Sequence, residues 1–272
     1  MKQSIMTLML LIIGLSCAVA QNDWPTFKKN SEKFYHYVAD EQVENFSFLL
    51  TSRSFVDYMD QVADSNFTYP LKAIWVRNRG NYYILQPLPT QDDSLRRNTL
   101  TRIQFMKNFY SGTQEDWHKF CFSSPLADLD EKAEVVFAND TVSAVLKYNE
   151  QGVAGYERRT FTAGGQLGRV VWQLNDQRII TTPFYEEINN KWLCVGWRSQ
   201  MYTAGEVTSG LQASVLYTEI DERILPESIV TTIQSVNDPG ASSRITLYLK
   251  DFVFNEQLEV LKPEEKPSDG AN

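Results

Sequence analysis

The sequence predicts an α+β protein in which an antiparallel β-meander packs under N-terminal helices. In Lys191–Thr203 and Glu206–Thr218 the odd positions are mostly apolar, whereas the even positions are mixed or polar. Successive side chains of a strand point to opposite faces, so this period of two indicates strands with one apolar face. Neighbouring strand-like segments are separated by short turns, which excludes the helix-length crossovers of a parallel sheet.

The predicted strands follow one another along the chain. A first hairpin turns at Asn78-Arg79-Gly80, between residues 72–77 and 81–86. After Pro125, Gly, Asn, Asp or Pro bounds each strand-like segment. The further predicted strands are Ala133–Ala138, Thr141–Tyr148, Val153–Phe161, Gly168–Leu174, Arg178–Thr182, Lys191–Thr203, Glu206–Thr218, Ser228–Val236 and Ile245–Asn255. They belong to a single predicted domain over residues 21–262, and the polar residues 263–272 predict a disordered tail.

Two stretches show a helical period. From Pro25 to about Asp64, apolar residues recur at three- and four-residue spacing, in a first run and in a second run that starts at Phe48. They predict one or two amphipathic helices that lie on the sheet. Asp92–Phe122 predicts a further helix, interrupted at Ser111-Gly112.

Residues 1–20 have the three parts of a secretory signal peptide. Lys2 supplies the positive charge, residues 6–15 the apolar run, and Ala18-Val19-Ala20 the cleavage site. No apolar run reaches the roughly 20 residues of a transmembrane helix. The sequence therefore predicts an exported protein without a transmembrane segment, located in the periplasm or cell envelope if the source is bacterial. An alternative is cleavage before Cys17 and acylation of that cysteine.

Charge and motifs narrow the classes of partner. The formal net charge is −8, and loss of Lys2 with the signal peptide changes it to −9. An acidic surface repels phosphate backbones, which argues against nucleic acid. No motif indicates a cofactor. The Gly-rich stretch Ala163–Gly168 lacks the Lys-Ser/Thr of a phosphate loop and predicts a turn. The two histidines, His36 and His118, lack the further ligands of a zinc site.

Two cysteines remain after the signal peptide, Cys121 and Cys194. In an exported protein they form a possible disulfide that closes a long loop and contributes about 4 kcal/mol. The alternative is two buried thiols, because both cysteines stand among aromatic and aliphatic residues, where free cysteine behaves as a small apolar side chain. Both alternatives stay open at the level of sequence.

Evidence for catalysis is weak, and the sequence predicts a protein that is not an enzyme. The carboxylate groupings with the potential to form a glycosidase pair are Glu186-Glu187 and Glu219/Asp221/Glu222. Adjacent acids in a loop are usually surface charge. The Gly-x-Ser-x-Gly pattern of a nucleophile elbow is absent from the sequence.

Aromatic residues are the remaining feature. Many of them fall in predicted strands, where aromatic side chains are ordinary core residues. Some are expected instead to line an apolar cavity between the sheet and the helices. The residues predicted to bind such a ligand are Trp75, Trp172, Trp197, Met201 and Leu211.

The order of elements resembles that of the periplasmic outer-membrane lipoprotein carriers. The resemblance is carried by Leu225-Pro226-Glu227-Ser228-Ile229 and by the last strand, Ile245–Asn255, with its Phe252-Val253-Phe254-Asn255 ending. It implies a curved open sheet or half-barrel whose concave apolar face holds a lipid or a lipoprotein acyl chain. The leading hypothesis is thus an exported, non-catalytic protein whose partner is an apolar small molecule or a lipidated protein. The alternative is a carbohydrate- or protein-binding β-module of the cell envelope that uses exposed Trp and Tyr as stacking platforms.

Overall fold

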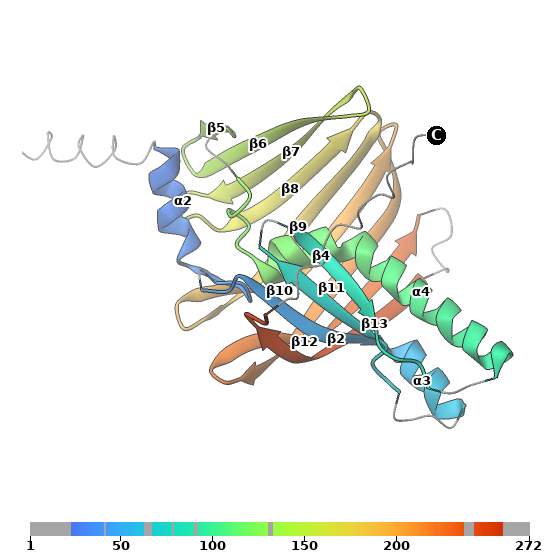
Figure 1. Ribbon diagram of the computed structural model, residues 1–272. Helices are drawn as coiled ribbons and strands as arrows, with labels where there is room; N and C mark the ends of the chain where they lie inside the picture. Colours follow the sequence, from blue (N-terminus) through green and yellow to red (C-terminus); the bar gives the residue numbers. More distant parts are fainter. Residues whose placement is uncertain are drawn as a thin grey trace, which may run out of the picture.

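The protein forms one open antiparallel sheet with helices packed on it (Figure 1). The computed structural model describes residues 23–40, 42–62, 67–77, 79–89, 92–129, 133–236 and 242–257. Over the described residues the sheet has 13 strands. Twelve form the antiparallel order β4-β3-β2-β13-β12-β11-β10-β9-β8-β7-β6-β5, and the short β1 pairs with β10 in parallel. The predicted α+β class and the antiparallel arrangement are confirmed.

The N-terminal half of the chain supplies the helices and the first strands. These elements are α2 (Trp24–Glu32), β1 (Tyr35–His36), β2 (Asn45–Ser52), α3 (Arg53–Gln61), β3 (Leu71–Val76), β4 (Gly80–Leu85), α4 (Asp93–Trp117) and the π-helix η1 (His118–Phe122). The hairpin of β3 and β4 turns at the predicted position.

The C-terminal half is a continuous meander, as predicted. Its strands are β5 (Glu134–Phe137), β6 (Thr141–Glu150), β7 (Val153–Thr162), β8 (Leu167–Leu174), β9 (Gln177–Ile188), β10 (Lys191–Thr203), β11 (Glu206–Ile220), β12 (Arg223–Ser235) and β13 (Ser242–Phe254). The last strand, β13, then pairs with β2, so the N-terminal hairpin extends the same sheet.

The helical prediction for Pro25 to Asp64 is wrong over two stretches. Helix α2 ends at Glu32, and Tyr35, which belongs to the first predicted run, lies in strand β1. Phe48 and Leu49, assigned to a second helical run, lie in strand β2, between β13 and β3. Most residues of β2 are buried on both faces, since α3 packs on this region while the other face meets the core. A short apolar run of this kind has no alternating polar face, so periodicity alone does not separate strand from helix. Only the end of the run, α3, is helical.

The principal helix on the sheet is α4, and not the N-terminal helices as expected. Asp92 caps its N-terminus by accepting a hydrogen bond from the backbone N–H of Leu95. The helix continues through Ser111-Gly112 without the predicted interruption. By contrast, α2 lies at the end of strands β5 to β8 (Figure 1), where Phe27 contacts Phe137 and Phe161.

The predicted Gly-rich turn joins β7 to β8 and contacts the segment around the end of α2 and β1. Gly165 has a φ of +94°, and a Cβ there would lie 2.1 Å from the Ser31 Oγ at the end of α2. The Tyr35 hydroxyl donates to the Gly165 carbonyl at 2.7 Å and accepts from the Leu167 N–H at 2.6 Å. A glycine is therefore required here by both conformation and space.

Several predictions concern residues outside the described ranges. The signal peptide of residues 1–20, Cys17 and the tail of residues 263–272 all lie there. Among the described helices, none is both long and apolar enough to cross a membrane.

Candidate functional site

The five predicted ligand-binding residues share one face of the sheet. Strand register places Trp172, Met201 and Leu211 on the same side as Trp197, and Trp75 joins them through its pairing with Phe46 on β2. We call this the inner face, because α4 packs on it. The five residues nevertheless occupy three different environments.

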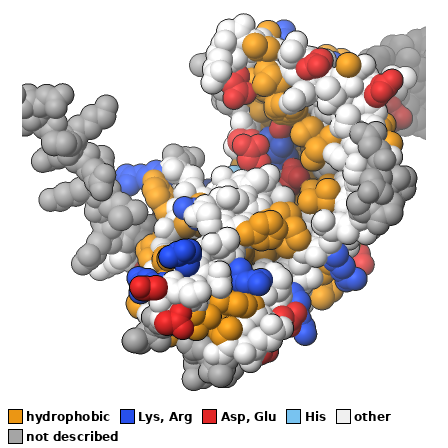
Figure 2. Space-filling model, turned by 90° about the vertical axis from the view of Figure 1, so that its right-hand side faces the viewer, with side chains coloured by type: hydrophobic (Ala, Val, Ile, Leu, Met, Phe, Trp, Pro, Cys, Tyr) orange, Lys and Arg blue, Asp and Glu red, His pale blue; other side chains and the backbone are white. Residues whose placement is uncertain are grey.

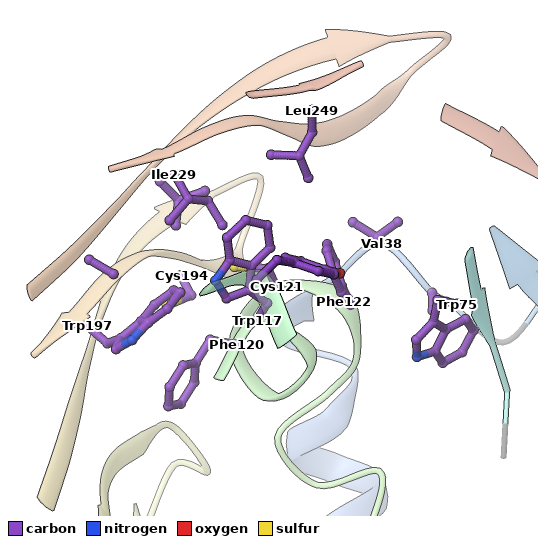
Figure 3. Close-up of a cluster of buried hydrophobic side chains, with 14 of the residues drawn as sticks. Val38, Trp75, Trp117, Phe120, Cys121, Phe122, Cys194, Trp197, Ile229 and Leu249 are labelled. Carbon is purple, nitrogen blue, oxygen red and sulfur yellow. The ribbon is translucent and has the colours of Figure 1, made fainter. Parts of the chain in front are cut away.

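Trp75 and Trp197 lie in the filled core and not in a cavity (Figure 3). Trp197 is 1% exposed, and its ring centroid lies 5.3 Å from that of Phe120 in the π-helix. Trp75 stacks on Phe46 at 5.2 Å and contacts His118 at 5.8 Å. Their surroundings are protein side chains, so both residues stabilise the packing of the π-helix against the sheet.

The other three predicted residues are closer to open space. Leu211 borders a hollow of about 720 Å³ over β10 to β12, whose other lining residues include Gln200, Gln212 and Gln234. Strand register places these three glutamines on the outer face, so this hollow lies mainly on the side of the sheet opposite to α4. Met201 is half-buried on β10 and pairs with Ser209. Trp172 lines a separate cleft over β6 to β8. The five predicted residues thus share one face of the sheet but do not form one site.

Helix α4 runs along strand β4, and this α4–β4 seam carries two hollows. Asn81, Tyr83 and Leu85 alternate along β4 and point to the inner face. The Tyr83 hydroxyl donates a hydrogen bond to the Gln114 side chain near the end of α4. One hollow lies on each side of this bridge: the groove toward the start of α4 and the cleft toward the π-helix.

The groove has a volume of about 700 Å³, and its walls are mainly apolar. The apolar side chains of these walls are Leu71, Leu85, Leu100, Ile103 and Phe105, and polar residues such as Gln104 and Asn108 also line the groove. Phe105 is 59% exposed, Leu85 43% and Leu100 38%, so large apolar side chains stay in contact with solvent around it. Contiguous exposed apolar surface of this kind marks binding sites more often than isolated exposed residues do.

Helix α4 supplies positive charge to the wall of the groove. Between Ser94 and Gln114, helix α4 carries Arg96, Arg97, Arg102 and Lys107 and no acidic residue, although the whole chain has a net charge of −8. Arg97 and Lys107 line the groove itself. The Lys107 ammonium lies 5.5 Å from the centre of the Tyr83 ring, which holds this charge at the groove wall.

The cleft has a volume of about 430 Å³ and contains the ionic groups of the inner face. Figure 2 shows this side of the molecule hollowed, with acidic and basic side chains at the bottom of the hollow. Its floor comes from β6 to β8 and its opposite wall from the end of α4 and the π-helix. The floor residues are Leu146, Tyr148, Glu157, Arg159 and Trp172, and the wall includes Gln114, Glu115, His118 and Lys119.

Arg159 organises the charges of the cleft. It is 2% exposed, forms paired hydrogen bonds with the Asp128 carboxylate, and donates to Glu157 at 2.6 Å. Glu157 also accepts from Lys119 at 2.7 Å. Burial raises the pKa of Glu157 and of Asp128, but the neighbouring cations outweigh burial and hold both pKa values below their ordinary range. Both carboxylates are therefore ionised at neutral pH.

The π-helix fixes His118 in the cleft wall. Its backbone carbonyl accepts from the Ser123 N–H at 2.8 Å, and its Nδ1 is 2.9 Å from the Ser123 hydroxyl. Burial lowers the pKa of His118, so the imidazole is neutral at pH 7. Because Ser123 occupies Nδ1, Nε2 is the ring nitrogen left for a ligand. Wider turns of this type often occur at functional sites.

The two cysteines are free and buried in the described structure. Tyr217 links them, since its hydroxyl donates to the Cys194 carbonyl at 2.6 Å and lies 3.5 Å from the Cys121 sulfur. Burial raises the pKa of both thiols, which keeps them protonated. This arrangement is the buried-thiol alternative (Figure 3).

The acidic residues considered for catalysis are all exposed. Glu186 and Glu187 lie in β9 and not in a loop, and Glu219, Asp221 and Glu222 lie at the β11–β12 hairpin. None of them lines the groove or the cleft. Within the described ranges, no cluster of three or more His, Cys, Asp or Glu side chains is suited to a metal ion.

Sequence reasoning missed most residues of the seam. Groove and cleft are built from β4, α4, the π-helix and β6 to β8, which only the topology brings together. One signal was available: the absence of acids between Ser94 and Gln114 in an acidic chain. No family model, curated protein or solved structure matches this chain.

Proposed function

We propose that this protein is a non-catalytic binding protein for an anionic amphiphile, a single acyl chain with an acidic head, held in the groove. The observation that carries the proposal is the combination of an open apolar groove with cations at its wall, on an otherwise acidic protein. Burial of a chain contributes roughly 0.8 kcal/mol per CH₂ group. Arg97 and Lys107 are placed to pair with the head.

This proposal moves the ligand from the sheet interior to the α4–β4 seam. The interior is occupied by side chains such as Trp117, Trp197 and Phe48, whose exposure is at most 1%. The groove volume of about 700 Å³ lies within the range of small-molecule sites. The resemblance to the lipoprotein carriers and the half-barrel that it implies stay predictions. The location of the protein outside the cytoplasm is likewise a prediction, based on the signal peptide. N-terminal sequencing of the exported protein tests it.

Displacement of 11-(dansylamino)undecanoic acid by palmitate tests the function. We expect saturable binding by the full chain, and at least tenfold weaker binding by R97E, because this substitution places an acid beside the acidic head. The matched control is R96E, which makes the same charge change at the adjacent exposed position outside the groove. Equal loss in both variants would indicate a general charge effect, and no saturable binding by the unmodified chain would exclude the proposal.

A second pair of variants tests the apolar wall. F105S removes a ring that is 59% exposed in the groove, and F184S removes one that is 40% exposed on β9. We expect F105S to weaken palmitate binding and F184S to leave it unchanged. Because both rings are exposed, folding stability should change little in either case.

A further inference from the structure

The floor of the cleft includes the aromatic side chains of Tyr148 and Trp172 beside the Glu157 carboxylate. Strand register aligns Leu146, Glu157 and Trp172 side by side across β6, β7 and β8. In the adjacent row Tyr148 pairs with Gly155, and a Cβ at Gly155 would lie 2.4 Å from the Tyr148 ring. The glycine therefore lets the Tyr148 ring lie across β7, where its hydroxyl reaches the Gln173 carbonyl of β8 at 3.3 Å.

The opposite wall offers uncharged hydrogen-bonding groups. Asn81 and Gln114 present side-chain amides, and His118 presents a neutral imidazole. The Gln114 carbonyl oxygen is already used by Tyr83, so its NH₂ group is the part of this lining side chain that is left to donate to a ligand. Donors and acceptors thus surround an aromatic floor.

The charges of the cleft are largely neutralised within it. Lys119 and Arg159 pair with Glu157, and Arg159 also pairs with Asp128. These pairs leave no unpaired cation among the described lining residues for a phosphate or carboxylate. A neutral ligand with many hydroxyl groups fits better, since hydroxyls both donate and accept and leave the ion pairs intact.

We propose that the cleft is a binding site for a neutral saccharide. The sugar ring would stack its C–H face on Trp172 and Tyr148, and its hydroxyls would bond to Asn81, Gln114 and His118. Aromatic rings carry a negative face that favours such contacts. This site is separate from the groove, and it goes beyond the proposed binding of an amphiphile.

The test uses the full chain and four neutral disaccharides, namely maltose, cellobiose, lactose and N,N′-diacetylchitobiose, in saturation-transfer NMR and titration calorimetry. We expect at least one to bind and W172A to weaken that binding at least tenfold. The matched control is Y156A, which removes an aromatic ring from the opposite face of the adjacent strand β7 and should leave binding unchanged. Thermal unfolding checks that both variants fold.

Two further outcomes decide the proposal. Binding by R97E equal to that of the unmodified chain would show that the saccharide site is independent of the groove, whether or not palmitate binds. G155A should also weaken saccharide binding, because the added methyl group displaces the Tyr148 ring. Absence of binding for all four disaccharides, or equal affinity in W172A, would overturn the proposal and leave the ion pairs as a structural anchor.

Discussion

The inner face of the sheet has two regions that differ in how they are covered. Over β2 and the middle of β10 to β13, the end of α4 and the π-helix fill the space with rings such as Trp117 and Phe120, and the inner-face residues beneath them are mostly buried. Over β6 to β8 the same face is open, and buried ion pairs lie beside the partly exposed rings of Tyr148 and Trp172. The comparison shows that the extent of the helical cover, and not the strand sequence, determines where a site can form.

The largest expected effect tests the filled region. Trp117 is fully buried and its ring lies 4.8 Å from that of Tyr110. W117A should lower the free energy of unfolding by about 3 to 5 kcal/mol, as large core truncations do. W172A, in the open region, should cost clearly less. Urea denaturation of both variants checks this order, and equal losses would contradict the difference between the regions.

The next effect tests the open region. R159M leaves Asp128 without its paired donor and Glu157 with Lys119 as its remaining partner. This substitution should lower the free energy of unfolding by about 3 kcal/mol. The control K147M breaks the exposed pair of Lys147 with Glu134 and should cost less than about 0.5 kcal/mol. If R159M loses no more folding stability than K147M does, the ion pairs of Arg159 do not stabilise the fold.

The cost of R159M should depend on pH. Folding lowers the pKa of Glu157 and Asp128, so their contribution is present above the ordinary values of 4.5 and 3.8 and is lost as the pH falls through the lower folded values. The difference in stability between the unmodified chain and R159M should therefore become smaller as the pH falls below these ordinary values. Unfolding measured between pH 3 and 8 tests this; a constant difference would argue against ion pairing as the cause.

Asp116, beside the cleft wall, gives a smaller effect of opposite sign. Burial raises its pKa from 3.8 to about 6. The folded state therefore holds the Asp116 proton more tightly than the unfolded state does. The resulting contribution to folding stability is fully present below pH 3.8 and is lost as the pH rises through about 6. Asparagine does not titrate. Between pH 4 and pH 8 the free energy of unfolding of D116N should therefore rise by up to about 3 kcal/mol relative to that of the unmodified chain. A flat difference over that range would contradict the raised pKa.

The smallest effect tests the continuity of α4. Gly112 lies inside the helix, and a Cβ there would meet no atom within 4 Å. G112A should stabilise the protein by about 0.5 to 1 kcal/mol, because alanine favours the helix. If α4 is instead interrupted at this position, as the sequence predicts, the substitution should have no effect or destabilise the protein.

The fold was largely predictable from the sequence, and the site was not. Alternation over Lys191–Thr203 and Glu206–Thr218 predicts β10 and β11 almost to the residue, because local turns and side-chain parity specify a meander. Strand β2 was missed because both of its faces are buried, which removes the alternation. Trp172 was found as an aromatic strand residue, whereas His118 and Arg159 reach the cleft through packing between distant segments, which no local pattern reports.

Chemical-shift mapping with sodium decanoate tests the central claim, that the ligand site lies on the α4–β4 seam and not inside the sheet. In backbone NMR spectra of the full chain, we expect saturable shifts at Arg97, Leu100 and Phe105 and on β4 near Leu85. Resonances of Trp197 and of the hollow around Leu211 should not move. Shifts that centre on Trp197 or Leu211, with α4 unaffected, would contradict the account.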